Sequence, residues 1–122
     1  MRPDLALSLA ALAVLPSMAR ADPAEIVGAE ARADPSGWTV AVTLRHGDTG
    51  WEDYADGWRL VSRDGDVLAT RALAHPHVDE QPFTRSLSGL DLPQGEAVFV
   101  ESSTSVTSWS GARFRLPIPP SD

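Results

Sequence analysis

The residue types best suited to chemistry are concentrated in one stretch of thirteen residues, His75–Leu87, with the sequence HPHVDEQPFTRSL. This stretch holds two of the three histidines in the chain. Side chains alternate between the two sides of an extended segment, so His75 and His77 are expected to point to the same side. A third imidazole from His46 would complete a three-nitrogen site of the kind that suits copper, zinc or nickel. Carboxylates that would add an oxygen ligand are those of Asp48, Asp53, Asp79 and Glu80.

The same residues also have a purely structural interpretation. The three histidines would then pack against aromatic rings and form hydrogen bonds with loop backbone. The sequence lacks a cysteine ligand and an HExxH motif, which would favour a metal site. Arg85 has two interpretations as well. It either binds a carboxylate of a partner through two hydrogen bonds, or it forms an internal ion pair with Glu80 that fixes the loop to the next strand. We expect the structural ion pair, with Phe83 directed into the core.

Aromatic side chains form a second set of candidate binding residues. Trp51 and Tyr54 lie in a segment rich in glycine and aspartate (46–57), and Trp109 lies in a later polar segment. Such residues either form an exposed binding platform or cover the open end of the core. We expect Trp51 and Trp109 to be exposed, because large exposed aromatic side chains mark interaction sites. Trp58, at the start of a strand, is expected to be the core tryptophan of the domain.

The elements that position these residues have the sequence patterns of β-strands. Residues 38–45 alternate strictly between larger apolar side chains and smaller or polar ones, which indicates a strand with one buried face. The sequences DPSG (34–37) and RDGD (63–66) predict tight turns. In the last strand, Arg113 is expected to face solvent. The complete set of expected strands is 25–33, 38–45, 58–63, 67–73, 83–90, 96–103 and 111–117.

Seven short strands in about 100 residues, without a helical pattern, predict an all-β fold. Their spacing is typical of an immunoglobulin-like or fibronectin-III-like sandwich of about seven antiparallel strands. Because consecutive antiparallel strands alternate in direction, the connections 46–57, 74–82 and 104–110 should meet at one end of the sandwich. Binding residues are often found on loops held by a rigid scaffold, so this end is the candidate site.

The N-terminal segment Met1–Ala21 has the layout of a secretory signal peptide. An arginine follows the start, an apolar run spans Leu5–Leu15, and small residues precede an expected cleavage after Ala21. The apolar run has eleven residues, whereas a membrane-spanning helix needs about 20. We therefore expect a signal peptide at 1–21 and a single β-sandwich domain at 22–122, periplasmic or secreted, with no membrane span after cleavage. The chain has no cysteine. We therefore expect no disulfide and no lipid anchor at the cleavage site.

Charge and missing motifs narrow the classes of function. Without Arg2, Arg20 and Asp4 of the leader, 8 basic and 16 acidic residues remain, a net charge of −8. Such a surface repels nucleic acids and anionic membranes. The sequence contains no GxSxG turn, catalytic cysteine, phosphate-binding loop or dinucleotide-binding glycine pattern. We therefore predict a protein that is not an enzyme and does not bind nucleic acid.

Three segments carry a resemblance to a known family. They are His46–Trp51 (HGDTGW), Tyr54–Trp58 (YADGW) and His75–Leu87, the last of which contains the pattern HPHxxEQPFTRSL. On these residues the chain resembles a family of small exported bacterial proteins without an established activity, from about residue 38 to Phe114–Pro117 (FRLP). In that family the last loop often carries His-Gly and Gly-Gly pairs, which residues 104–111 lack. The resemblance implies export and a sandwich fold, and it names no function.

Two hypotheses from different classes follow. The first is a non-enzymatic interaction module that binds an unknown protein or small ligand, without a cofactor, through one loop end. Its binding residues would be Trp51, Tyr54, His75, His77 and Trp109. The alternative is a periplasmic copper- or zinc-binding protein, with the metal held by His46, His75, His77 and Asp48.

Overall fold

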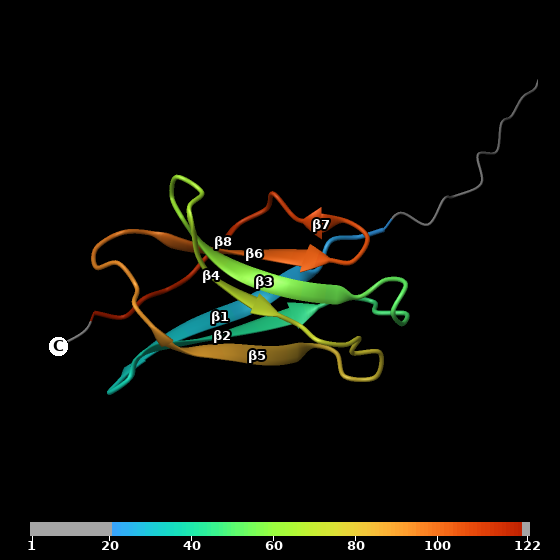
Figure 1. The fold of residues 1–122 in the computed structure, drawn as a ribbon, viewed down its shortest axis with the longest axis horizontal. Coiled ribbons are helices and arrows are strands. Elements are labelled where there is room, and N and C mark those ends of the chain that lie inside the picture. Colours follow the sequence, from blue (N-terminus) through green and yellow to red (C-terminus); the bar gives the residue numbers. More distant parts are fainter. Residues whose placement is uncertain (1–20, 121–122) are drawn as a thin grey trace, which may run out of the picture.

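The computed structural model describes residues 21–120, which form β-strands and no helix. Strands β1, β2 and β5 make a three-stranded sheet, and β4, β3, β6 and β7 lie in that order in a five-stranded sheet, where β8 also pairs with β6 (Figure 1). All the pairings are antiparallel, which confirms the predicted all-β sandwich. The expected signal peptide, except for Ala21, lies outside the described residues. The strand bounds are β1 Glu25–Asp34, β2 Gly37–Arg45, β3 Ala55–Ser62, β4 Val67–Ala72, β5 Phe83–Leu90, β6 Val98–Thr104, β7 Ser108–Trp109 and β8 Phe114–Arg115.

The expected strands 25–33 and 38–45 form a hairpin of β1 and β2, joined at the predicted turn. Its turn is fixed by Asp34, whose Oδ1 accepts hydrogen bonds from the backbone N–H and the hydroxyl of Ser36, at 3.0 and 2.7 Å. Gly37 completes the turn with a φ of 127°, and a side chain there would meet the carbonyl oxygen of Leu90 at 2.7 Å. The expected alternation in β2 is confirmed, because the residues on one face are all buried: Trp38, Val40, Val42 and Leu44.

The hydrophobic core lies between the two sheets. Trp58 is fully buried in it, as predicted, and Phe83 is directed into it at the start of β5. The sheets are also joined along both sides of the sandwich. The Ser102 hydroxyl of β6 donates to the carbonyl of Ala24 before β1 at 2.7 Å, and Arg71 of β4 donates from Nε to the carbonyl of Ser86 in β5 at 3.0 Å.

Strand β3 begins earlier than predicted, at Ala55 rather than Trp58. The backbone N–H of Ala55 donates to the carboxylate of Asp48 at 3.0 Å, and Ala55 pairs with Thr104 across the sheet. Residues 55–57, predicted as part of a loop, therefore belong to β3, because Asp48 and Thr104 hold Ala55 in the sheet.

The C-terminal part also differs from the prediction. Of the expected strand 111–117 only Phe114–Arg115 is a strand, β8, and a further short strand, β7, forms within the expected loop 104–110. Both pair with the same edge of β6 at different positions. A turn after β6 starts this arrangement, because the Thr104 hydroxyl accepts the backbone N–H of Thr107 at 2.8 Å. Residues 104–110, predicted as a loop, thus include the tight hairpin between β6 and β7.

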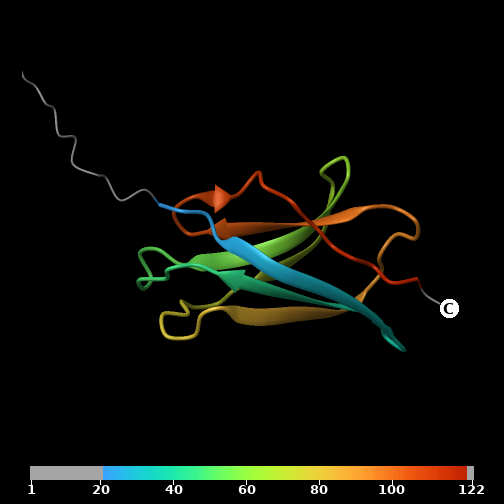
Figure 2. The ribbon, with the colours of Figure 1, turned by 180° about the vertical axis from the view of Figure 1, so that it is seen from behind.

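The termini of the described chain lie toward opposite ends of the sandwich (Figure 2). The N-terminal residues approach the end that carries the connections 46–54, 73–82 and 105–107, whereas the C-terminal tail runs to the end with the turns 35–36 and 63–66. No helix within residues 21–120 is long and apolar enough to cross a membrane.

Candidate functional site

Three connections meet at one end of the sandwich, as the strand directions predicted (Figure 1). They are residues 46–54 between β2 and β3, 73–82 between β4 and β5, and 105–107 between β6 and β7, and we call them together the loop end. The first and third are joined directly, since Tyr54 and Ser105 exchange two hydrogen bonds: Ser105 N–H to the Tyr54 carbonyl at 2.9 Å, and Tyr54 N–H to the Ser105 hydroxyl at 3.1 Å.

The carboxylate of Asp48 organises the inside of the loop end. Its side chain is completely buried. Oδ1 accepts hydrogen bonds from the Ala55 backbone at 3.0 Å and from Nδ1 of His46 at 2.7 Å, while Oδ2 accepts the backbone N–H of His77 at 2.8 Å. One side chain therefore ties the first loop, the start of β3 and the second loop to each other.

Both ring nitrogens of His46 are used in this network. Nδ1 faces the Asp48 carboxylate at 2.7 Å, and Nε2 faces the backbone carbonyl of Asp22 at 3.0 Å. Each ring nitrogen therefore has an oxygen partner within the protein. The carboxylate of Asp53, at 3.7 Å from Nε2, adds a second negative charge. His46 thus holds the N-terminal segment against the loops.

His77 is also buried but takes a different role. Its ring stacks on Phe83, with centroids 3.9 Å apart and an interplanar angle of 9°, which anchors the second loop to the core. Nη2 of Arg85 donates to Nε2 at 2.9 Å, so this nitrogen accepts and the ring is neutral. Burial, and then the positive charge of Arg85, hold the pKa of His77 below its ordinary value.

Arg85 connects His77 to Glu80. The same Nη2 atom lies 3.1 Å from Oε1 of Glu80, which is the ion pair expected from the sequence. The hydrogen bond from Arg85 lowers the pKa of Glu80. However, the Glu80 side chain is 57% exposed, so the pair lies at the surface and its charges are screened by water. The hydrogen bond to the buried His77 ring therefore holds Arg85 to the loop more firmly than the exposed ion pair with Glu80 does.

Gln81 is a further organising residue of the loop end. Its side-chain oxygen accepts the backbone N–H of His46 at 2.9 Å, and its amide nitrogen donates to the carbonyl of His77 at 2.8 Å. The amide group can serve two loops because it carries a donor and an acceptor. Neither this role nor that of Asp48 has a local sequence signal, because the partners lie up to 35 residues away in the chain.

The outer surface of the loop end carries large apolar side chains. Trp51 is 67% exposed, and Val78 and Val106 are each 52% exposed, so that each of the three loops presents one of them. Trp51 sits at the tip of a turn closed by pairing of Gly50 with Asp53, and its ring meets that of Tyr54 edge-on at 5.4 Å. These contacts hold an exposed indole in a defined position.

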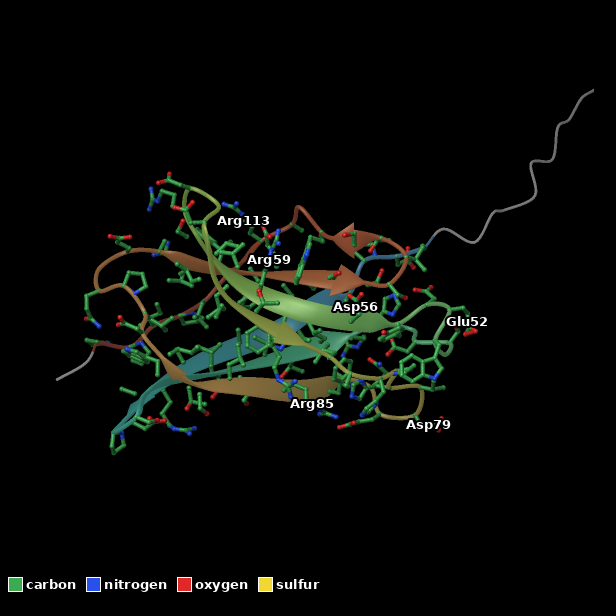
Figure 3. All side chains as sticks on the ribbon, in the orientation of Figure 1. Glu52, Asp56, Arg59, Asp79, Arg85 and Arg113 are labelled. Carbon is green, nitrogen blue, oxygen red and sulfur yellow. The ribbon has the colours of Figure 1, made fainter. Side chains whose placement is uncertain are left out.

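Trp109, predicted as an exposed residue of the same site, lies elsewhere. It is half-buried on the outer face of the five-stranded sheet, where the guanidinium of Arg59 lies 4.1 Å from its ring centre. Figure 3 shows Arg59 over the body of this sheet, away from Glu52 and Asp79 at the loop end. Trp109 therefore lies against the sheet in β7, directly after the third loop, and not at the tip of a loop as Trp51 does.

Arg113 is exposed, as expected, but it precedes β8 and forms an ion pair. Its Nε donates to Oε2 of Glu101 at 3.0 Å, and Arg59 reaches Oε1 of the same carboxylate at 2.9 Å. Glu101 is buried under these two arginines. The outer face of the sheet thus carries a compact group of two cations and one buried anion.

The metal hypothesis receives no geometric support from the described part of the chain. Within residues 21–120, no three histidine or acidic side chains form a group that could hold a metal ion. Both nitrogens of His46 are engaged with Asp48 and Asp22, and Nε2 of His77 accepts from Arg85. Only His75 is exposed, with Nδ1 at 3.0 Å from the carbonyl of Pro76.

Comparison with known proteins gives one relative. A protein of Halomicrobium mukohataei with the name "Putative lipoprotein" is 42% identical over 60 residues, which is 49% of this chain and 29% of the relative. The match thus covers less than a third of the relative's length. No family model matches the chain, and no solved structure matches it either.

Proposed function

We propose that this protein is an exported, non-enzymatic interaction module that binds a partner through its loop end. The observation that carries the proposal is the distribution of exposed apolar side chains. Six large apolar residues are exposed among residues 21–120, and three of them, Trp51, Val78 and Val106, lie in the loop end, one in each loop. Exposed apolar side chains that gather at one place are typical of interaction sites.

The inside of the loop end supports the same proposal. Asp48, both ring nitrogens of His46 and Nε2 of His77 form hydrogen bonds within the protein, which supports a structural role for these groups. A rigid scaffold lowers the entropy cost of binding, because the loops are already ordered before the partner arrives. The partner would therefore meet a preformed surface.

Export is supported by two independent observations. The sequence Met1–Ala21 has the arrangement of a secretory signal peptide, and the relative from Halomicrobium mukohataei has a lipoprotein name. We propose that the partner is met outside the cytoplasm.

The proposal can be tested by affinity capture from an extract of the cell envelope. Wild-type protein is compared with the triple variant Trp51→Ala, Val78→Ala, Val106→Ala. The chain offers a matched control, Val27→Ala, Val67→Ala, Leu68→Ala, since these three apolar residues are exposed on strands β1 and β4. We expect the loop-end variant to lose the captured partner and the control to retain it, with thermal melts that show both variants folded. Equal capture by both variants would contradict the proposal.

A further inference from the structure

The charges of the loop end have one sign. Residues 46–54, 73–82 and 105–107 contain five acidic residues and no lysine or arginine. The nearest cation with a contact to them, Arg85 in β5, already binds His77 and Glu80. The other arginines lie on strands, in the turn at the opposite end or in the segment before β8, and two of them, Arg59 and Arg113, are paired with Glu101. The acidic side chains of the loop end are Asp48, Glu52, Asp53, Asp79 and Glu80.

Two of these carboxylates are available to a partner. Glu52 and Asp79 are exposed and form no ion pair within residues 21–120, and Figure 3 shows both at the tip of the loop end. Glu52 follows Trp51 in the same tight turn, and its Oε1 accepts the hydroxyl of Thr49 at 3.1 Å. Asp79 follows Val78. Each of these two loops therefore places a carboxylate directly beside an exposed apolar side chain.

We infer that the partner of the loop end is a protein segment that combines arginine or lysine with apolar side chains. The inference rests on the proposed function and names the chemistry of the partner. Apolar groups of the partner would cover Trp51, Val78 and Val106, and its cations would face Glu52 and Asp79. The Trp51 ring also offers a face to a guanidinium or ammonium group. Acidic ligands are disfavoured at this surface because the loops carry no arginine or lysine, and the exposed Arg45 at the end of β2 is paired with Glu25.

A selection experiment tests this inference. Random peptides displayed on phage are selected on the immobilised exported protein, without assumption about their charge. We expect the enriched peptides to contain arginine or lysine close to aromatic or aliphatic residues. Their affinity should fall by about tenfold or more when the salt concentration is raised from about 50 to about 300 mM, because salt screens exposed charges. Enrichment of neutral or acidic peptides, or binding that is insensitive to salt, would overturn the inference.

Charge reversal tests whether the selected peptides bind at the loop end. The variant Glu52→Lys, Asp79→Lys should weaken the selected peptides by about tenfold or more. The matched control Asp91→Lys, Glu96→Lys makes the same change in net charge outside the loop end, on the connection between β5 and β6, and should change the affinity by less than about threefold. Equal losses in both variants would overturn the inference, since net charge alone would then explain binding. If the reversed variant melts early, Glu52→Gln, Asp79→Asn gives the same comparison without new charges.

The Trp51→Ala variant separates this inference from the proposed function. Peptides that bind both Trp51→Ala and Glu52→Lys, Asp79→Lys as well as wild type do not use the loop end, and both ideas fail. Peptides that tolerate only Trp51→Ala support the cationic partner and contradict the role of the apolar surface. Peptides that need Trp51 but tolerate the Glu52→Lys, Asp79→Lys change support the interaction surface and contradict its cationic partner. Loss of binding in both variants supports both.

Discussion

Oδ2 of Asp48 accepts the backbone N–H of His77 at 2.8 Å, across 29 residues of sequence. The other oxygen of the same carboxylate faces Nδ1 of His46 at 2.7 Å. A buried acidic side chain thus joins two long loops, which the amide group of Gln81 also connects. The exposed residues Trp51 and Val78, which are carried by these two loops, depend on that arrangement.

Replacement of Asp48 should therefore be costly. Asp48→Ala leaves two backbone N–H groups and the His46 ring without their acceptor in a buried region. We expect a loss of about 3–5 kcal/mol in the free energy of unfolding, measured by urea denaturation. The control Asp79→Ala removes an exposed carboxylate and should leave the urea midpoint unchanged. Similar midpoints for both variants would show that Asp48 does not organise the loops.

The buried Glu101 provides a second stability prediction. Glu101→Ala removes the shared partner of Arg59 and Arg113, and should reduce the free energy of unfolding by about 1–3 kcal/mol. Arg113→Ala should cost less, because Arg59 still neutralises the carboxylate. The exposed Arg115, which makes no ion pair within residues 21–120, serves as the control. A loss for Arg115→Ala equal to that for Glu101→Ala would refute this account of the outer face.

The stability of the protein should decrease in mildly acidic solution. Burial and the neighbouring Arg85 hold the pKa of His77 below its ordinary value of 6.5, so the unfolded chain binds this proton more readily than the folded chain. The contribution is therefore complete above pH 6.5 and is lost as the pH falls through that value toward the lower folded pKa. Glu80, whose pKa is lowered from 4.5, acts only in more acidic solution.

This pH dependence can be measured by urea denaturation between about pH 7.5 and about pH 5, a range that spans the titration of histidine. His77→Phe preserves an aromatic ring on Phe83 and removes the titrating group, so its stability should vary less with pH than that of wild type. His75→Asn, at an exposed position, should retain the wild-type dependence. A wild-type slope in His77→Phe would assign the effect to other groups.

The sequence predicts those parts of the fold that depend on local patterns. The alternation in β2 and the turn residues Asp34 and Gly37 act within a few positions of the chain, and the structure follows them. The broken last strand was not predicted, because it depends on the Thr104 hydroxyl capping a turn in a segment of uniformly small polar residues. Strand length in that region is decided by pairing with β6 and not by propensity.

In the candidate site, too, the features set by local sequence patterns were predicted and those set by distant contacts were not. The strand directions predict which loops meet, and the exposure of Trp51 agrees with expectation. The role of Asp48 as an acceptor for distant N–H groups was not predicted. The neighbouring sequence, with a histidine two positions away, is equally compatible with a metal ligand. The contact of Trp109 with Arg59 was not predicted, because the two residues lie 50 positions apart in the sequence.

The central claim, that the loop end is the surface that meets a partner, is tested most directly by crosslinking in living cells. A photoreactive aromatic amino acid replaces Trp51 in one variant, which keeps a large apolar ring at that position, and replaces the exposed Glu96, on the β5–β6 connection, in another. Both variants are irradiated in the organism that makes the protein. We expect a discrete crosslinked product of higher mass from position 51 and none from position 96. A product from position 96 alone, or equal products from both positions, would contradict the claim.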